Sequence, residues 1–210
     1  MSSKSFAMPL LFAVLFSVWM VLTFSGALAP FDEAGLLMFR DDSLAPVGGQ
    51  TMVAVMTGVT HLGDSITAIV AAVLAIGYVL LRGACKLAVW GSLALVGLFL
   101  LSPLLKLLFG RARPDIVEHL VHASTNSFPS GHAIRSFGIY LLIFMILRGF
   151  LPRHLRTPAV VVVLLVALAT GISRVYLGVH WPTDVIASWL VTFTWVTIWQ
   201  EKLSYKKDVV

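Results

Sequence analysis

Six apolar segments, separated by shorter polar connectors, constrain the fold of this chain more than any other feature. They cover residues 6–24, 65–81, 87–105, 132–147, 158–177 and 182–199. Their lengths are close to the roughly 20 residues that an α-helix needs to cross about 30 Å of hydrocarbon. Because a backbone in lipid must satisfy its own hydrogen bonds, such segments cross a membrane as helices. We therefore predict an all-α polytopic membrane protein with six transmembrane helices.

The overall composition agrees with this prediction. Hydrophobic residues make up 59% of the 210 residues and charged residues only 12%, which excludes an ordinary soluble domain. The single cysteine, Cys85, excludes an internal disulfide framework and a thiolate metal cluster. The sequence contains no internal repeat and no low-complexity tract, so we expect one integral membrane domain over residues 1–210.

The first apolar segment and the polar stretch after it need separate interpretation. An Ala-x-Ala pattern at 27–29 resembles the cleavage site of a secretory signal. We favour a retained first helix, because the apolar run is long and because Pro30 hinders cleavage. Farther on, the apolar run Met52–Thr60 is too short to cross a membrane. We expect it to form an interfacial helix, with His61 and Asp64 at the surface.

The distribution of charge predicts the orientation. Six spans put both termini on one side of the membrane. That side, with the connectors 82–86 and 148–156, carries nine basic residues, whereas the other side carries eight of the ten acids. Because positive connectors stay in the cytoplasm, we predict cytoplasmic termini. The net charge of +5 does not indicate nucleic acid, since the basic residues are dispersed between apolar runs.

One polar stretch, SRVYLGVHWPTD at 173–184, places an arginine, a histidine and a carboxylate at the mouth of an apolar segment. Ionisable groups are costly there unless they have a function. Arg174 and His180 flank a glycine bend, and Pro182 suits the first position of a new helix. Asp184 then lies in the first turn of that helix, where the helix dipole stabilises a carboxylate that reaches back to His180. Such a carboxylate prepares a histidine to act as a nucleophile or general base.

Two further polar stretches end or begin apolar segments in a similar way. The hexapeptide SFPSGH is a Pro-Ser-Gly turn that feeds a helix, so the backbone amides around Ser130, Gly131 and His132 would form an anion-binding N-terminus. Lys106 and Arg113 lie seven residues apart at the end of the third apolar segment. Together, the cations, histidines and carboxylate of the three stretches predict a phosphate as their common partner.

The motifs K-x6-RP, PSGH and SR-x5-H-x3-D, in this order, resemble those of the type 2 phosphatidic acid phosphatase superfamily, which also includes bacterial acid phosphatases and vanadium haloperoxidases. Every motif position matches. The matching residues are Lys106, Arg113, Pro114, Pro129, Ser130, Gly131, His132, Ser173, Arg174, His180 and Asp184. The motifs cover only residues 106–184, but three signatures in the right order are specific where a single short motif is not.

The resemblance implies a role for each polar motif residue. His180 would attack phosphorus in line and form a phosphohistidine, with Asp184 holding its ring. His132 would protonate the leaving oxygen and then activate the hydrolytic water. The phosphate oxygens would be held by Lys106, Arg113, Arg174, the Ser130 hydroxyl and the Gly131 amide. This clamp would replace the metal of other phosphotransferases, so we expect no metal and no cofactor.

The position of these residues at the ends of apolar segments suits a lipid phosphate. Membrane members of the family act on phosphatidic acid, phosphatidylglycerophosphate, lysophosphatidate, sphingoid phosphates and polyprenyl pyrophosphates. The short loops resemble the bacterial members, so undecaprenyl pyrophosphate and phosphatidylglycerophosphate are the first candidates. A bacterial plasma (inner) membrane is then expected, with the site facing the periplasm or exterior and with no obligate protein partner. Two alternatives are a lipid phosphotransferase with the same phosphohistidine and a non-catalytic transporter or binder of anionic lipids.

The remaining polar residues receive more ordinary interpretations. His119 and His122 have the spacing of metal ligands on a helix, but no third ligand accompanies them. We expect both of these, and His154, to be satisfied interfacial histidines. Arg111 lies between motif positions and receives no role. Arg135, one turn after His132, belongs to no motif, so surface snorkelling or pairing with an acid is the expectation, although contact with substrate is possible.

Overall fold

The computed structural model describes residues 3–204, whose regular elements are all helical. The helices are α1 (Ser3–Phe24), α2 (Ala29–Leu37), α3 (Gly49–Thr60), α4 (Ser65–Leu81), α5 (Cys85–Phe109), α6 (Gly131–Ile134), α7 (Tyr140–Leu147), α8 (Arg153–Tyr176) and α9 (Pro182–Trp199). A 3-10 turn, η1 (His61–Gly63), precedes α4, and a π-helical turn, η2 (Arg135–Ile139), joins α6 to α7. The all-α prediction is confirmed.

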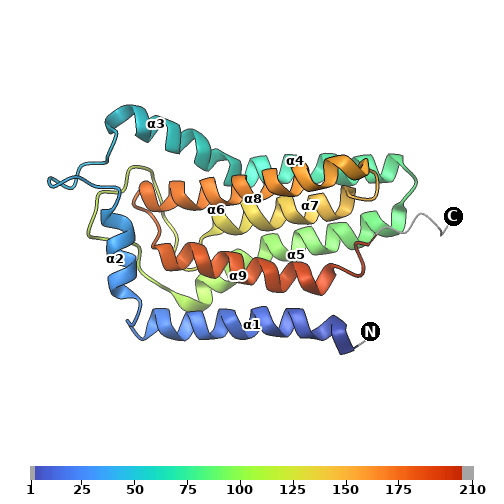
Figure 1. The fold of residues 1–210 in the computed structure, drawn as a ribbon, viewed down its shortest axis with the longest axis horizontal. Coiled ribbons are helices and arrows are strands. Elements are labelled where there is room, and N and C mark those ends of the chain that lie inside the picture. Colours follow the sequence, from blue (N-terminus) through green and yellow to red (C-terminus); the bar gives the residue numbers. More distant parts are fainter. Residues whose placement is uncertain (1–2, 205–210) are drawn as a thin grey trace.

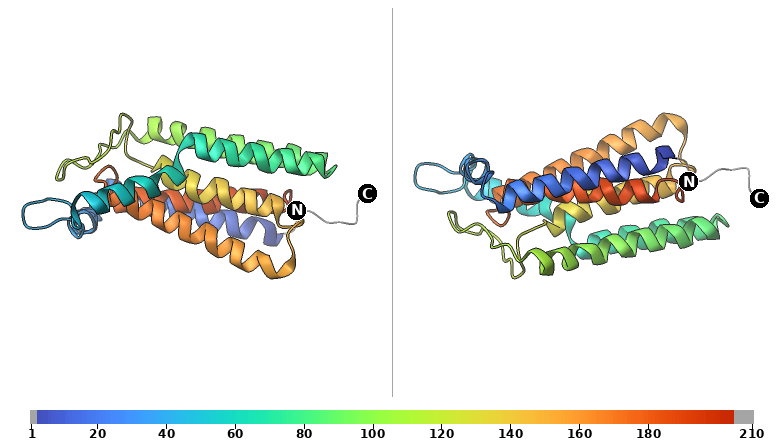
Figure 2. Two further views of the ribbon diagram at one scale, coloured as in Figure 1. Left: turned by 90° about the horizontal axis from the view of Figure 1, so that it is seen from above. Right: turned by 90° about the horizontal axis from the view of Figure 1, so that it is seen from below.

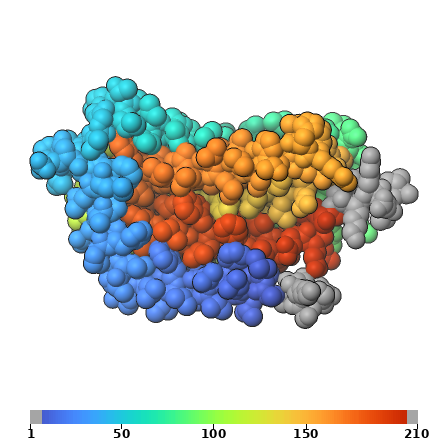
Figure 3. Space-filling view, viewed as in Figure 1, coloured from blue at the N-terminus to red at the C-terminus, as the bar shows by residue number. Residues whose placement is uncertain are grey.

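The long helices form an elongated bundle. Figures 1 and 2 show α1, α4, α5, α7, α8 and α9 running lengthwise, with α2 crossing one end. The space-filling view shows α8, α9 and α1 side by side on one face (Figure 3). The helix bounds agree with the six apolar segments, and the short helix predicted over Met52–Thr60 is α3.

The predicted number of membrane spans is not confirmed. Among the described residues, three helices are long and apolar enough to cross a membrane, namely α1, α5 and α8. A fourth span is obtained if α3–η1 and α4, which meet at an angle of 42°, count as one broken span. The helical segment Gly131–Leu147 is apolar but too short to count as a membrane span. Helix α9 is not among the candidate spans, and it carries buried polar residues at Thr183, Asp184, Ser188 and Thr192.

Many large apolar side chains on the lengthwise helices face outward. Leu81 is 87% exposed, Leu107 79% and Ile66 77%. A soluble protein does not leave so many apolar side chains in water, whereas lipid makes their exposure favourable. The surface of the bundle is therefore that of an integral membrane protein.

Close helix contacts hold the centre of the bundle together. A β-carbon on Gly138 would lie 2.3 Å from a methyl group of Leu98, and one on Gly97 would lie 2.5 Å from the Trp195 ring. Helix α5 therefore packs against η2 and α9 at glycine positions, where the absence of a side chain permits the approach. The Trp195 indole also donates to the Ala94 carbonyl at 2.9 Å.

The polar residues gather at one end of the bundle. The end of α8, the start of α9, the start of α6 and the connector 110–130 meet there, close to α2 and α3 (Figure 1). The start of α1 and the end of α9 lie at the opposite end. The three motifs are thus brought together by the alternation of helix direction, because each lies at a helix end on the same side.

Candidate active site

His180 lies in the connector between α8 and α9. The chain turns at Gly178, which has a φ of +74°, and a β-carbon there would lie 2.6 Å from the Glu118 carbonyl oxygen. The side chain of His180 is buried, with Nδ1 3.3 Å from Asp184 Oδ2 and Nε2 3.4 Å from Arg113 Nη1. Burial and the neighbouring positive charges of Arg174 and Arg113 hold the pKa of His180 well below its ordinary value of 6.5. The imidazole is therefore neutral near pH 7, as a nitrogen nucleophile requires.

The carboxylate of Asp184 is held from several sides. The residue is 0% exposed and lies in the first turn of α9, which begins at Pro182 as the sequence predicts. Its Oδ2 accepts hydrogen bonds from the Ser127 hydroxyl at 2.5 Å and from the Trp181 amide at 3.0 Å. Because its partners leave it no freedom to turn, Asp184 fixes the orientation of the His180 ring.

Three predicted cations converge in front of His180. Lys106 Nζ donates to the Asn126 carbonyl, Arg113 Nη1 donates to the Val179 carbonyl, and Arg174 Nη1 donates to Thr60 Oγ1 at 2.9 Å. In the part of the chain that the structure describes, none of the three makes an ion pair with a carboxylate within 4.0 Å. Positive charges that are partly buried without a carboxylate form a site for an external anion.

The PSGH turn leads directly into helix α6, as predicted. Ser130 is its N-cap, and the hydroxyl accepts from the Ala133 amide at 3.4 Å. Ser130 is 0% exposed and does not line the cavity, so its hydroxyl caps the helix instead of reaching the open space. Gly131 does line the cavity, and a β-carbon there would approach Ser102 Oγ and Arg135 Nη1 to 3.1 Å each.

His132 has a carboxylate partner that the sequence did not indicate. Its Nε2 lies 2.9 Å from Asp64 Oδ1, and Asp64 Oδ2 lies 2.7 Å from Nδ1 of His61. A β-carbon on Gly63 would lie only 2.8 Å from the His132 carbonyl oxygen, so this glycine permits the contact. The Asp64 side chain is 38% exposed, in agreement with its expected place at the surface, and it also contacts a predicted catalytic histidine. An acid at the mouth of an apolar segment was the available signal.

Arg111 also has a place in the site. It bridges two acids, donating to Asp32 Oδ2 at 2.7 Å and to Asp184 Oδ1 at 2.5 Å. Asp32 is 2% exposed and also accepts from the backbone amide of Thr183 at 2.9 Å. The Arg111 guanidinium lies 5.5 Å from the centre of the Trp181 ring. Arg111 therefore joins helix α2 to the carboxylate behind His180, a role that its position between motif residues did not reveal.

A cavity of about 330 Å³ lies between these groups. Its polar lining includes Lys106, Arg113, Gly131, His132, Arg135, Arg174 and His180. Six of the eight predicted site residues thus line one cavity, while Ser130 and Asp184 support it from behind. His119 and His122 lie in the irregular connector formed by residues 110–130, where His119 Nε2 lies 2.6 Å from the Pro114 carbonyl oxygen.

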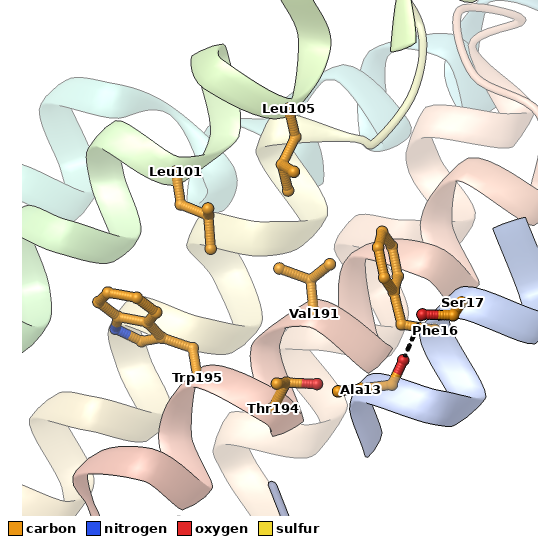
Figure 4. A pocket seen from close by; sticks show the side chains of 8 residues that line it. All are labelled: Ala13, Phe16, Ser17, Leu101, Leu105, Val191, Thr194 and Trp195. Atoms are coloured by element: carbon orange, nitrogen blue, oxygen red, sulfur yellow. Dashed lines mark hydrogen bonds between the residues drawn. The ribbon is translucent and has the colours of Figure 1, made fainter. Parts of the chain in front are cut away.

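Two other cavities, unlike the cationic one, are lined without charged side chains. One, of about 220 Å³, lies between α1, α5 and α9, and its lining side chains include no charged group (Figure 4). The second, also about 220 Å³, is an apolar groove between α4 and α5. Phe99 lines both this groove and the cationic cavity. The groove therefore lies next to the cationic cavity.

A neutral histidine nitrogen, a second histidine and several cations around one cavity are the groups that phosphoryl transfer requires. The sequence model of the PAP2 superfamily matches residues 86–207, more than half of the chain. The chain belongs to the PAP2 superfamily. All three motifs of this PAP2 protein lie within the matched residues.

Curated relatives and a solved structure agree with this assignment. The PAP2 chain is 36% identical over 159 residues to phosphatidylglycerophosphatase B of Bacillus subtilis, covering 71% of this chain and 75% of that protein. It is 37% identical over 73 residues to an undecaprenyl-diphosphatase of Sulfolobus acidocaldarius, covering 34% and 30% of the two chains. The crystal structure of a transmembrane PAP2-type phosphatidylglycerolphosphate phosphatase from Bacillus subtilis superimposes with a TM-score of 0.81 at 29% identity, over 92% of this chain and 94% of that one.

These comparisons confirm the family that the motifs indicated. They also agree with the apolar surface of the bundle, because the superimposed structure is that of a transmembrane protein. This PAP2 protein is therefore a phosphatase-family enzyme of the membrane.

Proposed function

We propose that this protein hydrolyses lipid phosphates through a phosphohistidine at His180. The observation that carries the proposal is the position of His180 Nε2, which is free of carboxylates and faces a cavity that Lys106, Arg113 and Arg174 also line. The opposite ring nitrogen is bonded to Asp184. This arrangement directs the lone pair of a neutral imidazole at a bound phosphoryl group.

In the first step, His180 Nε2 would form a bond to phosphorus while the bond from phosphorus to the leaving oxygen breaks. His132, in its doubly protonated form, would give a proton to that oxygen, so that the leaving group departs neutralised. Because His132 Nε2 is bonded to Asp64, Nδ1 is the nitrogen that can meet the leaving oxygen. Asp184 would stabilise the positive charge that develops on the His180 ring. The three cations would hold the non-bridging oxygens.

In the second step, water would attack the phosphohistidine. His132 would take a proton from the water, the bond between phosphorus and nitrogen would break, and inorganic phosphate would leave. No redox change occurs, and the proton that His132 gave in the first step is recovered. We expect the cationic clamp to carry the charge of the transition state without a metal or cofactor.

The apolar groove between α4 and α5 supports a lipid as the substrate. It shares Phe99 with the cationic cavity, so a headgroup in the cavity and an acyl or isoprenoid chain in the groove would form one continuous ligand. A soluble phosphate ester would leave this groove unused. The named relatives act on phosphatidylglycerophosphate and on undecaprenyl diphosphate, and both fit a headgroup-and-chain arrangement of this kind.

The charges of the connectors bear on the position of the protein in the membrane. We propose one membrane domain over the whole chain, with cytoplasmic termini and the cavity at the outer face of a bacterial plasma membrane. The charge distribution of the connectors supports this orientation. A reporter fused after Trp199 and another in the connector 110–130 would test it, since opposite accessibility is expected.

Phosphate release by the purified protein in detergent, with a chelator present, tests the proposed function. The substrates are phosphatidylglycerophosphate, phosphatidic acid and undecaprenyl diphosphate, compared with His180→Ala and with the matched exposed-residue control Arg153→Gln. Release by the wild type and the control, with none by His180→Ala, is the expected result. Acid-labile, base-stable labelling of the wild type by ³²P-substrate identifies the phosphohistidine. Transfer of the label to an added lipid instead of water would indicate a phosphotransferase, and binding without turnover would overturn the enzyme proposal.

A further inference from the structure

Arg135 is a fourth cation of the cavity and belongs to none of the three motifs. It neither snorkels to the surface nor pairs with an acid: it lines the cavity, and within the described residues no carboxylate lies within 4.0 Å of it in an ion pair. Its Nε donates to the Gly63 carbonyl at 2.8 Å, which fixes the direction of the guanidinium. Its Nη1 lies over Gly131, 3.1 Å from where a β-carbon would be. Its Nη2 lies 3.4 Å from His132 Nδ1, and among the described residues Nη1 has no hydrogen-bond partner.

A different arginine lies beside each of the two histidines. Arg113 Nη1 lies 3.4 Å from Nε2 of His180, and Arg135 Nη2 lies 3.4 Å from Nδ1 of His132. In the proposed reaction, the transferred phosphoryl group lies at His180 and the leaving oxygen lies at His132. Arg113 is therefore on the side of the group that is transferred, and Arg135 is on the side of the group that leaves.

We propose that Arg135 binds a second phosphate, carried by the leaving group, and that the preferred substrates of this site are lipid diphosphates. This inference rests on the proposed function. In a lipid diphosphate, the terminal phosphoryl group moves to His180, the bridging bond between phosphorus and oxygen breaks, and the leaving group is a lipid monophosphate. The guanidinium can donate to the non-bridging oxygens of that phosphate, which are negatively charged both before and after the bond breaks.

A neutral leaving group would make no use of this cation. When diacylglycerol leaves phosphatidic acid, no anion develops beyond the bridging oxygen, which His132 neutralises with a proton. The Arg135 guanidinium would then be desolvated in the closed complex without a partner, which is unfavourable for a charged group. With a diphosphate, the same cation pairs with the charged non-bridging oxygens of the phosphate that leaves, which favours binding and reaction of this substrate over a monophosphate.

The experiment compares two substrates with the same lipid chain, farnesyl diphosphate and farnesyl monophosphate, in detergent. The variants are Arg135→Gln, Arg135→Lys and the control Arg153→Gln, which removes an exposed arginine at the far end of α8. We expect the wild type to prefer the diphosphate. A hydrogen bond to a charged group is worth about 1.5–3 kcal/mol, so Arg135→Gln should lower the ratio of the two kcat/KM values by about tenfold to 150-fold. Arg135→Lys should retain part of the preference.

The outcomes separate this inference from the proposed function. If Arg135→Gln keeps the thermal midpoint of the wild type and lowers both kcat/KM values equally, or neither, Arg135 does not recognise the leaving group and the inference is wrong, although the phosphatase proposal stands. If the wild type releases phosphate from neither farnesyl substrate nor from the lipids named above, the proposed function itself fails. A misfolded variant would lose both activities, so a selective loss on the diphosphate also controls for folding.

Discussion

Removal of Arg111 tests whether a residue that never reaches the cavity supports the nucleophile. The guanidinium bonds to two carboxylates that are almost completely buried, Asp32 and Asp184. With Arg111→Gln, Asp184 loses its only cationic partner among the described residues. A buried carboxylate without a cation takes up a proton, because desolvation disfavours its charged form. A protonated Asp184 could no longer stabilise positive charge on His180.

The structure sets the magnitude of this effect. The lost bond is charge-assisted, with Arg111 Nη1 and Asp184 Oδ1 2.5 Å apart, and bonds of this kind contribute about 1.5–3 kcal/mol. If that stabilisation is required as the His180 ring becomes positive, kcat/KM should fall by about tenfold to 150-fold. Formation of the phosphohistidine in a single turnover should slow by the same factor, whereas KM should change little.

The matched control is Asp32→Asn, which leaves the bond between Arg111 and Asp184 in place. This variant weakens the attachment of α2 but keeps the charge behind His180, so its kcat/KM should remain within about threefold of the wild type, since the charge on Asp184 is retained. The thermal midpoint in detergent should fall for both variants. The reasoning would be refuted if Arg111→Gln kept full activity, or if the two variants lost activity equally, because the role of Arg111 would then be structural.

Three further predictions concern the other parts of the site. Asp64→Asn should lower kcat about tenfold, because His132 loses the carboxylate that orients it. The control His61→Gln should have little effect on kcat. Equal losses in the two variants would contradict a specific role of Asp64 toward His132. The His180 ring should remain neutral at pH 6 in ¹⁵N spectra, because burial and nearby cations lower its pKa, and titration at or above its ordinary value of 6.5 would contradict the site geometry. Ala72→Trp should fill the groove between α4 and α5 and raise KM for long-chain lipids more than for short-chain analogues. The control Leu81→Trp, at an outward-facing position, should affect both kinds of substrate alike. If Ala72→Trp changed KM equally for both chain lengths, the groove would not bind the lipid chain.

The elements of the fold were predictable because their signals are local. Apolar segments of span length predicted the long helices, and Pro182 and the PSGH turn predicted where α9 and α6 begin. Such signals depend on residues a few positions apart, so tertiary contacts are not needed to interpret them. The predicted number of spans was not confirmed, because the polar residues on α9 lower its hydropathy and because the segment Gly131–Leu147 is short.

The motif residues of the site were also predictable, but their supporting partners were not. Lys106, His132 and His180 lie in motifs whose spacing carries the family resemblance. Asp64, by contrast, lies 68 positions before His132, the residue it orients. No local pattern links two such positions. The same holds for Arg111 and Asp32, which are 79 positions apart.

The sequence by itself determined that this protein is a helical membrane protein with a phosphate-binding constellation, since hydropathy and motif spacing are properties of the linear chain. Only the tertiary structure decided which charges face the cavity and which lie behind it. Ser130, a predicted phosphate ligand, caps α6, while Arg135, which we expected to snorkel or to pair with an acid, lines the cavity beside His132. The direction of a side chain depends on which helices pack against it, and that packing joins residues from distant parts of the chain.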